Sequence, residues 1–130
     1  MIVRTTEEIT GTDRDVDGGS WRSKRIILAG DGVGFSFHET TIQEGAVCDF
    51  HYQHHIEAVW VVEGEGTLTN RETGEQHRLS AGTMYLLDGH ERHTVTCERQ
   101  LRMFCVFNPP VTGQEVHDET GAYPPPAPAA

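Results

Sequence analysis

A histidine-rich stretch near the middle of the chain carries side chains that could do chemistry. His51, His55 and Glu57 alternate along it, and alternate residues of an extended strand face the same side of a sheet. Tyr85 and Cys105 hold matching positions in two later stretches that also have the composition of strands. Imidazole, carboxylate, phenol and thiol groups on one sheet face are more than a core needs, so the pattern predicts a reactive pocket inside a β-structure.

The elements that must position these groups are short strands. Most of them are bounded by Gly, Asp, Asn or Ser, and strands spaced about 8–12 residues apart are typical of a sandwich or a closed barrel such as the jelly roll. Helix signals are confined to a capping box at Thr5–Glu8, followed by Gly11. The prediction is an all-β, jelly-roll-type β-barrel with minimal helix. The predicted strands are Arg25–Ala29, Gly34–Ile42, Ala46–Tyr52, Glu57–Val62, Gly66–Asn70, Gln76–Leu79, Thr83–Leu87, Thr94–Glu98 and Leu101–Asn108.

Length and composition narrow the class of protein. The 130 residues suffice for one domain, and a net charge of −10 without a basic stripe argues against nucleic acid as a partner. No apolar run approaches the ~20 residues needed to span a membrane, and the N-terminus has no apolar signal-peptide core. Three widely spaced cysteines are expected to be free thiols in a reducing cytoplasm. Residues 1–122 are predicted to form the single domain, with 123–130 as a proline-rich, flexible C-terminal tail.

Two spaced motifs resemble those of the cupin superfamily. The first motif is matched in register by Gly45, His51, Glu57 and Gly64, with Gln53 at the position of its second histidine. The second motif is echoed by Gly82 and His93, while Asp88, His90 and Cys97 occupy its proline, glycine and last positions. The resemblance therefore supports the cupin scaffold more strongly than the usual cupin metal site.

Glu57, Tyr85 and His93 remain as a candidate metal site. A neutral amide oxygen such as that of Gln53 is a weak ligand for a transition metal, so a different donor set is needed. Tyr85 has the parity to face inward and precedes the loop that leads to His93. A phenolate, a carboxylate and an imidazole would suit iron, and three protein ligands would leave positions open for a substrate.

Longer segments are similar to one more specific family. The segments are 21–25 (WRSKR), 34–40 (GFSFHET), 54–59 (HHIEAV), 63–66 (EGEG), 105–110 (CVFNPP) and 112–118 (TGQEVHD). The resemblance is to ectoine synthase and runs from Met1 to Tyr123. Its most specific parts are the HHIEAV block and the pair formed by CVFNPP and TGQEVHD, which separate this family from other cupins.

The resemblance implies an activity and a set of roles. Ectoine synthases close N-γ-acetyl-L-2,4-diaminobutyrate to the compatible solute ectoine with loss of water, in the response to osmotic stress. A cytoplasmic homodimer is implied, dependent on Fe2+ or another divalent transition metal, with Glu57, Tyr85 and His93 as ligands. Substrate contacts are implied for Trp21, Arg25, His38, Thr40, Cys105 and Phe107. Proton transfer, or close support of it, is implied for Tyr52, His55, Glu115 and His117.

Ring closure needs groups of these types. The substrate's α-amine must attack its own acetamide carbonyl, which a bound metal would polarise. Glu115, or Tyr52 as a phenolate, could take the proton of the amine. Arg25 is the natural bidentate partner for the substrate carboxylate. Trp21 and Phe107 could exclude water, which opposes a dehydration.

Two other functions stay open at this point. A different metal cupin, such as a dioxygenase or an isomerase, is disfavoured by Gln53. A non-catalytic, ligand-binding cupin would usually accompany a DNA-binding or effector domain, for which 130 residues leave no room. Cys105 could equally be a small core residue. The histidines expected to have structural roles are His51, His54, His77 and His90.

Overall fold

The structure is a computed structural model that describes residues 1–125. Helical structure there is limited to α1 and a 3₁₀ turn, η1, and the predicted capping box between Thr5 and Glu8 is present. None of the helices in this part of the chain has the length and apolar character required to cross a membrane. The elements are α1 (Thr6–Ile9), β1 (Asp15–Asp17), β2 (Trp21–Ile27), η1 (Ala29–Asp31), β3 (Ser36–Ile42), β4 (Val47–Phe50), β5 (Ile56–Asn70), β6 (Gln76–Leu79), β7 (Met84–Leu87) and β8 (His93–Asn108).

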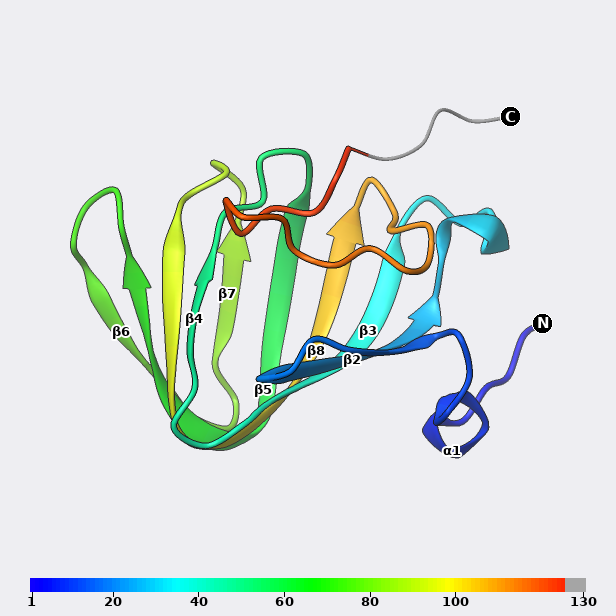
Figure 1. Cartoon of the computed structure of the whole chain (residues 1–130), viewed down its shortest axis with the longest axis horizontal. Helices are drawn as coiled ribbons and strands as arrows, with labels where there is room; N and C mark the ends of the chain where they lie inside the picture. Colours follow the sequence, from blue (N-terminus) through cyan, green and yellow to red (C-terminus); the bar gives the residue numbers. More distant parts are fainter. Residues whose placement is uncertain (126–130) are drawn as a thin grey trace.

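Antiparallel pairing joins the strands into one sheet. The main path runs β1-β2-β3-β8-β5-β6, with β4 added to β8 and β7 added to β5. Figure 1 shows that β5 and β8 bend through the base of the molecule, so the sheet folds over into two facing walls with an opening at the top. The predicted all-β fold with minimal helix is confirmed for the described residues. Over residues 1–125 the sheet stays open, however, and is not a barrel closed by a continuous ladder of hydrogen bonds.

The bend in β5 depends on Gly64. Its φ angle is +100°, and a β-carbon there would lie 2.1 Å from the backbone oxygen of Gln100, so no other residue fits without movement of the backbone. Pairing with β8 shifts register between Val61 and Gly66 but resumes on both sides. Because of this irregular corner, the sequence predicted two separate strands for each of β5 and β8, although each is continuous. The glycines and charges that suggested a break form the corner of one continuous strand.

The inner faces of the two walls hold the core. β5 buries Glu57, Val59 and Val61, and β8 buries every second residue over 101–107, so the predicted parity of these strands is confirmed. The parity prediction fails for His51 and Gln53, because β4 ends at Phe50 and the chain is irregular until β5 begins.

Residues 109–125, here called the C-terminal segment, contain no regular element and cross the open end of the folded sheet (Figure 1). The segment is attached at both ends: the Val111 amide donates to Ser36 Oγ (2.9 Å), and the His51 amide donates to the Gly121 oxygen (2.8 Å). Tyr123 is only 3% exposed. The prediction of a flexible tail from residue 123 is therefore wrong for Tyr123, which packs into the core, and its remainder at 126–130 lies outside the described residues.

Candidate active site

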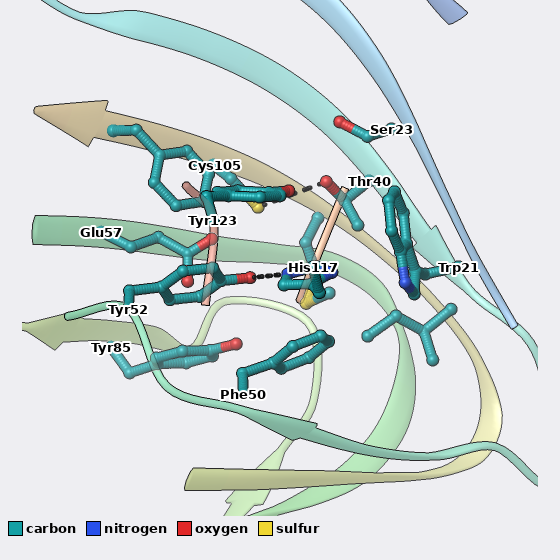
Figure 2. A pocket seen from close by; sticks show the side chains of 13 residues that line it. Trp21, Ser23, Thr40, Phe50, Tyr52, Glu57, Tyr85, Cys105, His117 and Tyr123 are labelled. Carbon is teal, nitrogen blue, oxygen red and sulfur yellow. Dashed lines mark hydrogen bonds between the residues drawn. The ribbon is translucent and has the colours of Figure 1, made fainter. Parts of the chain in front are cut away.

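A cavity lies between the two walls, and its lining includes His117 and Tyr123 of the C-terminal segment (Figure 2). Its wall combines aromatic rings with a small number of polar groups, which is typical of a site that excludes water and orients a small ligand. The lining residues are Trp21, Ser23, Thr40, Ile42, Phe50, Tyr52, Glu57, Tyr85, Met103, Cys105, Phe107, His117 and Tyr123.

Glu57 is the acidic group of the cavity wall. It is 5% exposed, and burial raises the pKa of its carboxyl to about 8, because a charged carboxylate is poorly solvated there. Burial likewise raises the pKa of the Tyr85 phenol well above its ordinary value. A nearby cation would stabilise the anionic form of both groups.

His93 is oriented as metal-binding histidines usually are. Its Nδ1 lies 3.0 Å from the Glu91 carbonyl oxygen, which can only accept, so Nδ1 carries the hydrogen and Nε2 presents a lone pair. Nε2 is buried and has no hydrogen-bond partner in the described part of the chain. The His93 ring faces the Tyr85 ring at a centroid distance of 6.5 Å.

These features fit the predicted metal set. Residues 1–125 hold no group of three or more His, Cys, Asp and Glu side chains that could bind a metal, so the predicted set depends on the phenolic oxygen of Tyr85 as its third donor. Tyr85 and Glu57 line the cavity, whereas His93 stands next to Tyr85 outside the lining. Two of the three predicted ligands thus share the cavity wall, and the third, His93, lies next to Tyr85.

Tyr52 and His117 form a partly buried hydrogen-bonded pair. The Tyr52 hydroxyl lies 2.7 Å from His117 Nε2, as the dashed line in Figure 2 shows. Burial raises the pKa of Tyr52 well above 10, and burial with the charge of Arg25 lowers the pKa of His117 to about 3. The phenol is therefore protonated and the imidazole neutral, so the prediction of Tyr52 as a phenolate base does not hold in this arrangement.

Glu115 and His55 lie outside the cavity lining. The Glu115 carboxylate accepts the amides of Thr112 and Gly113, each at 2.7 Å, and closes a turn of the C-terminal segment. Burial opposes its ionisation, but these hydrogen bonds outweigh burial and hold the pKa of Glu115 below its ordinary value. Its predicted role as a base in contact with substrate is not supported. His55 is 1% exposed, packs edge-on against Tyr123, and has no hydrogen bond to either ring nitrogen from residues 1–125.

Arg25 holds the C-terminal segment rather than facing the cavity. Its guanidinium is completely buried and donates to the carbonyl oxygens of Gly113 and Glu115, each at 2.5 Å. It also lies 5.5 Å from the centre of the Tyr123 ring. The predicted bidentate contact with a substrate carboxylate does not fit, because Nη1 and Nη2 are already engaged with backbone carbonyls.

The remaining predicted wall is largely present. Trp21, Thr40, Cys105 and Phe107 line the cavity, and the Cys105 thiol lies 3.5 Å from the Thr40 hydroxyl. His38 is completely buried behind this wall, against Phe107.

Two polar residues of the cavity wall, Ser23 and Tyr123, were not among the predicted site residues. Ser23 alternates with Trp21 and Arg25, and this signal was lost because β2 was predicted to begin only at Arg25. Tyr123 was assigned to the C-terminal tail because prolines follow it in the sequence.

Comparison with known proteins identifies the family. A sequence model described as ectoine synthase matches residues 1–127. Curated L-ectoine synthases from Mycolicibacterium gilvum and Mycolicibacterium vanbaalenii are 74% and 76% identical over 125 and 124 residues. These alignments cover 96% and 95% of the chain and the same shares of the two relatives. The chain belongs to the ectoine synthase family.

Family membership confirms the predicted enzyme class, a carbon–oxygen hydro-lyase of ectoine biosynthesis. The crystal structure of ectoine synthase from P. lautus has a TM-score of 0.88 at 48% identity and covers all of this chain and 94% of that one. A Cupin 2 conserved barrel domain protein from Salinispora arenicola has a TM-score of 0.64 at 20% identity, covering 82% of this chain and 87% of that one. This second likeness supports the cupin fold alone.

Proposed function

We propose that the chain converts N-γ-acetyl-L-2,4-diaminobutyrate to ectoine by one intramolecular condensation with release of water. The observation that carries this proposal is the cavity itself, where the Tyr52–His117 pair and Glu57 share a wall otherwise made mostly of aromatic and aliphatic side chains. Such a wall excludes water, which favours a dehydration. Family membership supplies the reaction class.

The reaction forms a C=N double bond between the α-amine nitrogen and the acetamide carbon, and breaks the C=O double bond of the acetamide. The α-amine nitrogen attacks the acetamide carbon, and the former carbonyl oxygen leaves as water with the two hydrogens of the amine. Folding the substrate on itself brings the reacting atoms together, and such positioning supplies a large part of the rate in intramolecular reactions. Trp21 and Phe107 provide the apolar surfaces between which the substrate folds.

The Tyr52–His117 pair moves protons in this scheme. Tyr52 is protonated and within hydrogen-bond distance of a neutral imidazole, so it can deliver its proton to the departing oxygen and regain one through His117. A positioned acid of this kind contributes roughly 10²–10⁴-fold to a rate. Glu115 acts at a distance, by shaping the turn of the C-terminal segment that Arg25 holds.

Glu57, Tyr85 and His93 would hold a divalent metal, with Fe2+ as first choice and other divalent transition metals as alternatives. The support is the buried Nε2 of His93, which has no partner among residues 1–125, the Tyr85 ring beside it, and the buried carboxyl of Glu57 in the cavity wall that Tyr85 shares. When bound, the metal would supply Lewis-acid polarisation of the acetamide carbonyl. Anaerobic Fe2+ titration should show one site per chain in the wild type and at least about tenfold weaker binding in His93→Ala.

The chain acts as a cytoplasmic homodimer in the response to osmotic stress. Support for the dimer comes from apolar side chains on the outer face of β5 and β7, where Trp60 lies opposite Met84 in the pairing of the two strands. These residues are 49% and 58% exposed, and Leu86 beside them is 47% exposed. Adjoining exposed apolar groups of this kind mark interaction surfaces. Sedimentation should give a dimer for the wild type and a monomer for Trp60→Lys with Met84→Glu.

The activity test uses protein reconstituted anaerobically with Fe2+ and incubated with N-γ-acetyl-L-2,4-diaminobutyrate. Chromatography should detect ectoine from the wild type and little from Glu57→Ala. A folded, metal-loaded wild-type protein that forms no ectoine would reject the proposed reaction. Oxygen consumption with a thiol or diketone substrate would point to a dioxygenase instead.

A further inference from the structure

A chain of hydrogen bonds runs from the cavity wall into the sheet through His38. Its Nδ1 lies 3.2 Å from Ser23 Oγ, and its Nε2 lies 3.0 Å from Ser36 Oγ. His38 is completely buried and outside the cavity lining, whereas Ser23 is part of that lining. His38 also packs against Phe107, but its only hydrogen-bonded link to the cavity lining among residues 1–125 is the Ser23 hydroxyl.

Both ends of this chain are fixed by groups that can only donate. The Arg25 Nε–H donates to Ser23 Oγ (3.3 Å), and the Val111 amide donates to Ser36 Oγ (2.9 Å). A serine hydroxyl has two lone pairs and one hydrogen. Each serine oxygen therefore has one lone pair and one hydrogen left, to be shared between His38 and any further partner.

The tautomer of His38 determines which serine donates its hydroxyl hydrogen to the ring and which serine accepts a hydrogen from it. Burial, followed by the charge of Arg25, lowers the pKa of His38 to about 3, so the ring is neutral with one donor and one acceptor nitrogen. With the hydrogen on Nε2, Ser36 Oγ would accept two bonds, and its own hydrogen would find no acceptor among residues 1–125. Ser36 is completely buried, so leaving its hydroxyl hydrogen unpaired is disfavoured.

In the other tautomer only the hydroxyl hydrogen of Ser23, which lines the cavity, is left without an acceptor among residues 1–125. With the hydrogen on Nδ1, Ser36 donates to Nε2 and accepts from Val111, so it is satisfied. Ser23 Oγ then accepts from both Arg25 and His38. Both of its lone pairs are occupied, and its hydrogen is free to point into the cavity.

We propose that His38 is a positioning residue whose Nδ1–H tautomer makes the Ser23 hydroxyl an obligate hydrogen-bond donor to the α-carboxylate of the substrate. The identity of the substrate rests on the proposed function. The carboxylate is chosen because Ser23 is bonded to the buried Arg25 guanidinium, whose hydrogen-bond partners in the described residues are all uncharged. An anion at Ser23 would compensate that charge.

The tautomer is tested without any turnover. Long-range ¹H–¹⁵N NMR of protein labelled at histidine distinguishes a protonated from an unprotonated ring nitrogen, and the His38 signals are assigned by their absence from His38→Phe or, if that variant does not fold, His38→Gln. The expected result is a hydrogen on Nδ1 and a bare Nε2. A hydrogen on Nε2 would overturn the proposal.

The role in binding is tested by a double-mutant cycle. Ser23→Ala should lower kcat/KM roughly 10- to 100-fold, as expected for loss of a hydrogen bond to a charged group, mainly through KM. His38→Phe should lower it by a similar factor, and the double variant little more. Thr41→Ala, a hydroxyl deletion on β3 outside the cavity lining, is the matched control and should change kcat/KM less than about twofold.

A substrate analogue whose α-carboxylate is amidated tests whether Ser23 contacts the carboxylate or the acetamide oxygen. The effect of Ser23→Ala should shrink to a few-fold with the analogue, whereas an unchanged effect would place Ser23 at the acetamide oxygen and overturn the proposal. Fully additive effects of Ser23→Ala and His38→Phe would also overturn it. A wild-type protein that forms no ectoine would reject the proposed function alone, and the NMR result would still decide the tautomer.

Discussion

Replacing Tyr52 with phenylalanine removes one oxygen atom from the centre of the proposed proton path. The hydroxyl makes a 2.7 Å hydrogen bond to His117 Nε2 in the wall of the cavity. His117 Nδ1 already has no partner in the described part of the chain, so the variant leaves the whole imidazole unpaired. The ring of residue 52 keeps its packing against Phe50 and Phe107, because the phenyl group is unchanged.

The expected magnitude follows from the role assigned to this hydroxyl. Loss of a positioned acid should lower kcat by roughly 10²-fold or more, while KM changes less than about threefold. The stability cost should be modest, about 1–2 kcal/mol for one hydrogen bond and the buried imidazole it leaves unpaired. Steady-state kinetics followed by NMR, together with urea unfolding, measure the two effects separately.

Tyr123→Phe is the matched control. It deletes the same atom from the same cavity, but its hydroxyl has only a 3.5 Å contact with Arg25 Nη2. Its kcat should fall less than about fivefold. Equal losses of kcat in the two variants, or a loss confined to KM in Tyr52→Phe, would refute the proton-transfer role of Tyr52.

Three further predictions concern the scaffold. Gly64→Ala should lower the free energy of unfolding, measured by urea denaturation, by at least about 3 kcal/mol, because it combines a left-handed φ with a clash against the backbone. Gly74→Ala is the control: its φ is similar but the space around it is open, so it should cost about 1 kcal/mol. The pKa of Asp15 is lowered from 3.8 to about 2, first by its hydrogen bond from Arg22, so the stability that this pair contributes is complete above about pH 4 and is lost as the pH falls through 2. Asp15→Asn should therefore remove about 1 kcal/mol of the acid dependence of the free energy of unfolding, a figure reduced for solvent screening. An unchanged curve of stability against pH would contradict this prediction. Arg25→Lys should leave the carbonyls of the C-terminal segment without their fork of donors and speed limited proteolysis there roughly tenfold, and cleavage at the wild-type rate would contradict the proposed attachment.

The sequence predicted the parts of the fold that depend on local pattern. Strand parity alone placed Glu57, Tyr85 and Cys105 on the inner face, because alternation along a strand is a local property. The corner at Gly64 was read as a break, since sequence does not show whether pairing resumes after a bend. Confusion of a bent strand with two strands is expected where glycine interrupts an alternating pattern.

The parts of the site that failed depend on contacts distant in sequence. The predictions for Arg25 and Glu115 followed their charge, but both are occupied by partners in the C-terminal segment, which no local pattern reveals. Tyr123 was predicted to belong to a flexible tail because prolines follow it, yet its ring stacks on His117 at a centroid distance of 4.4 Å. Ser23 gained its significance only through His38, a residue fifteen positions away in sequence.

The central claim is that the acetamide oxygen leaves as water during ring closure. We would supply N-γ-acetyl-L-2,4-diaminobutyrate labelled with ¹⁸O at the acetamide oxygen to the Fe2+-reconstituted protein and follow the label by mass spectrometry. Unlabelled ectoine together with labelled water is the predicted result. Labelled acetate with free diaminobutyrate would show hydrolysis of the amide instead, and would contradict a site built for condensation.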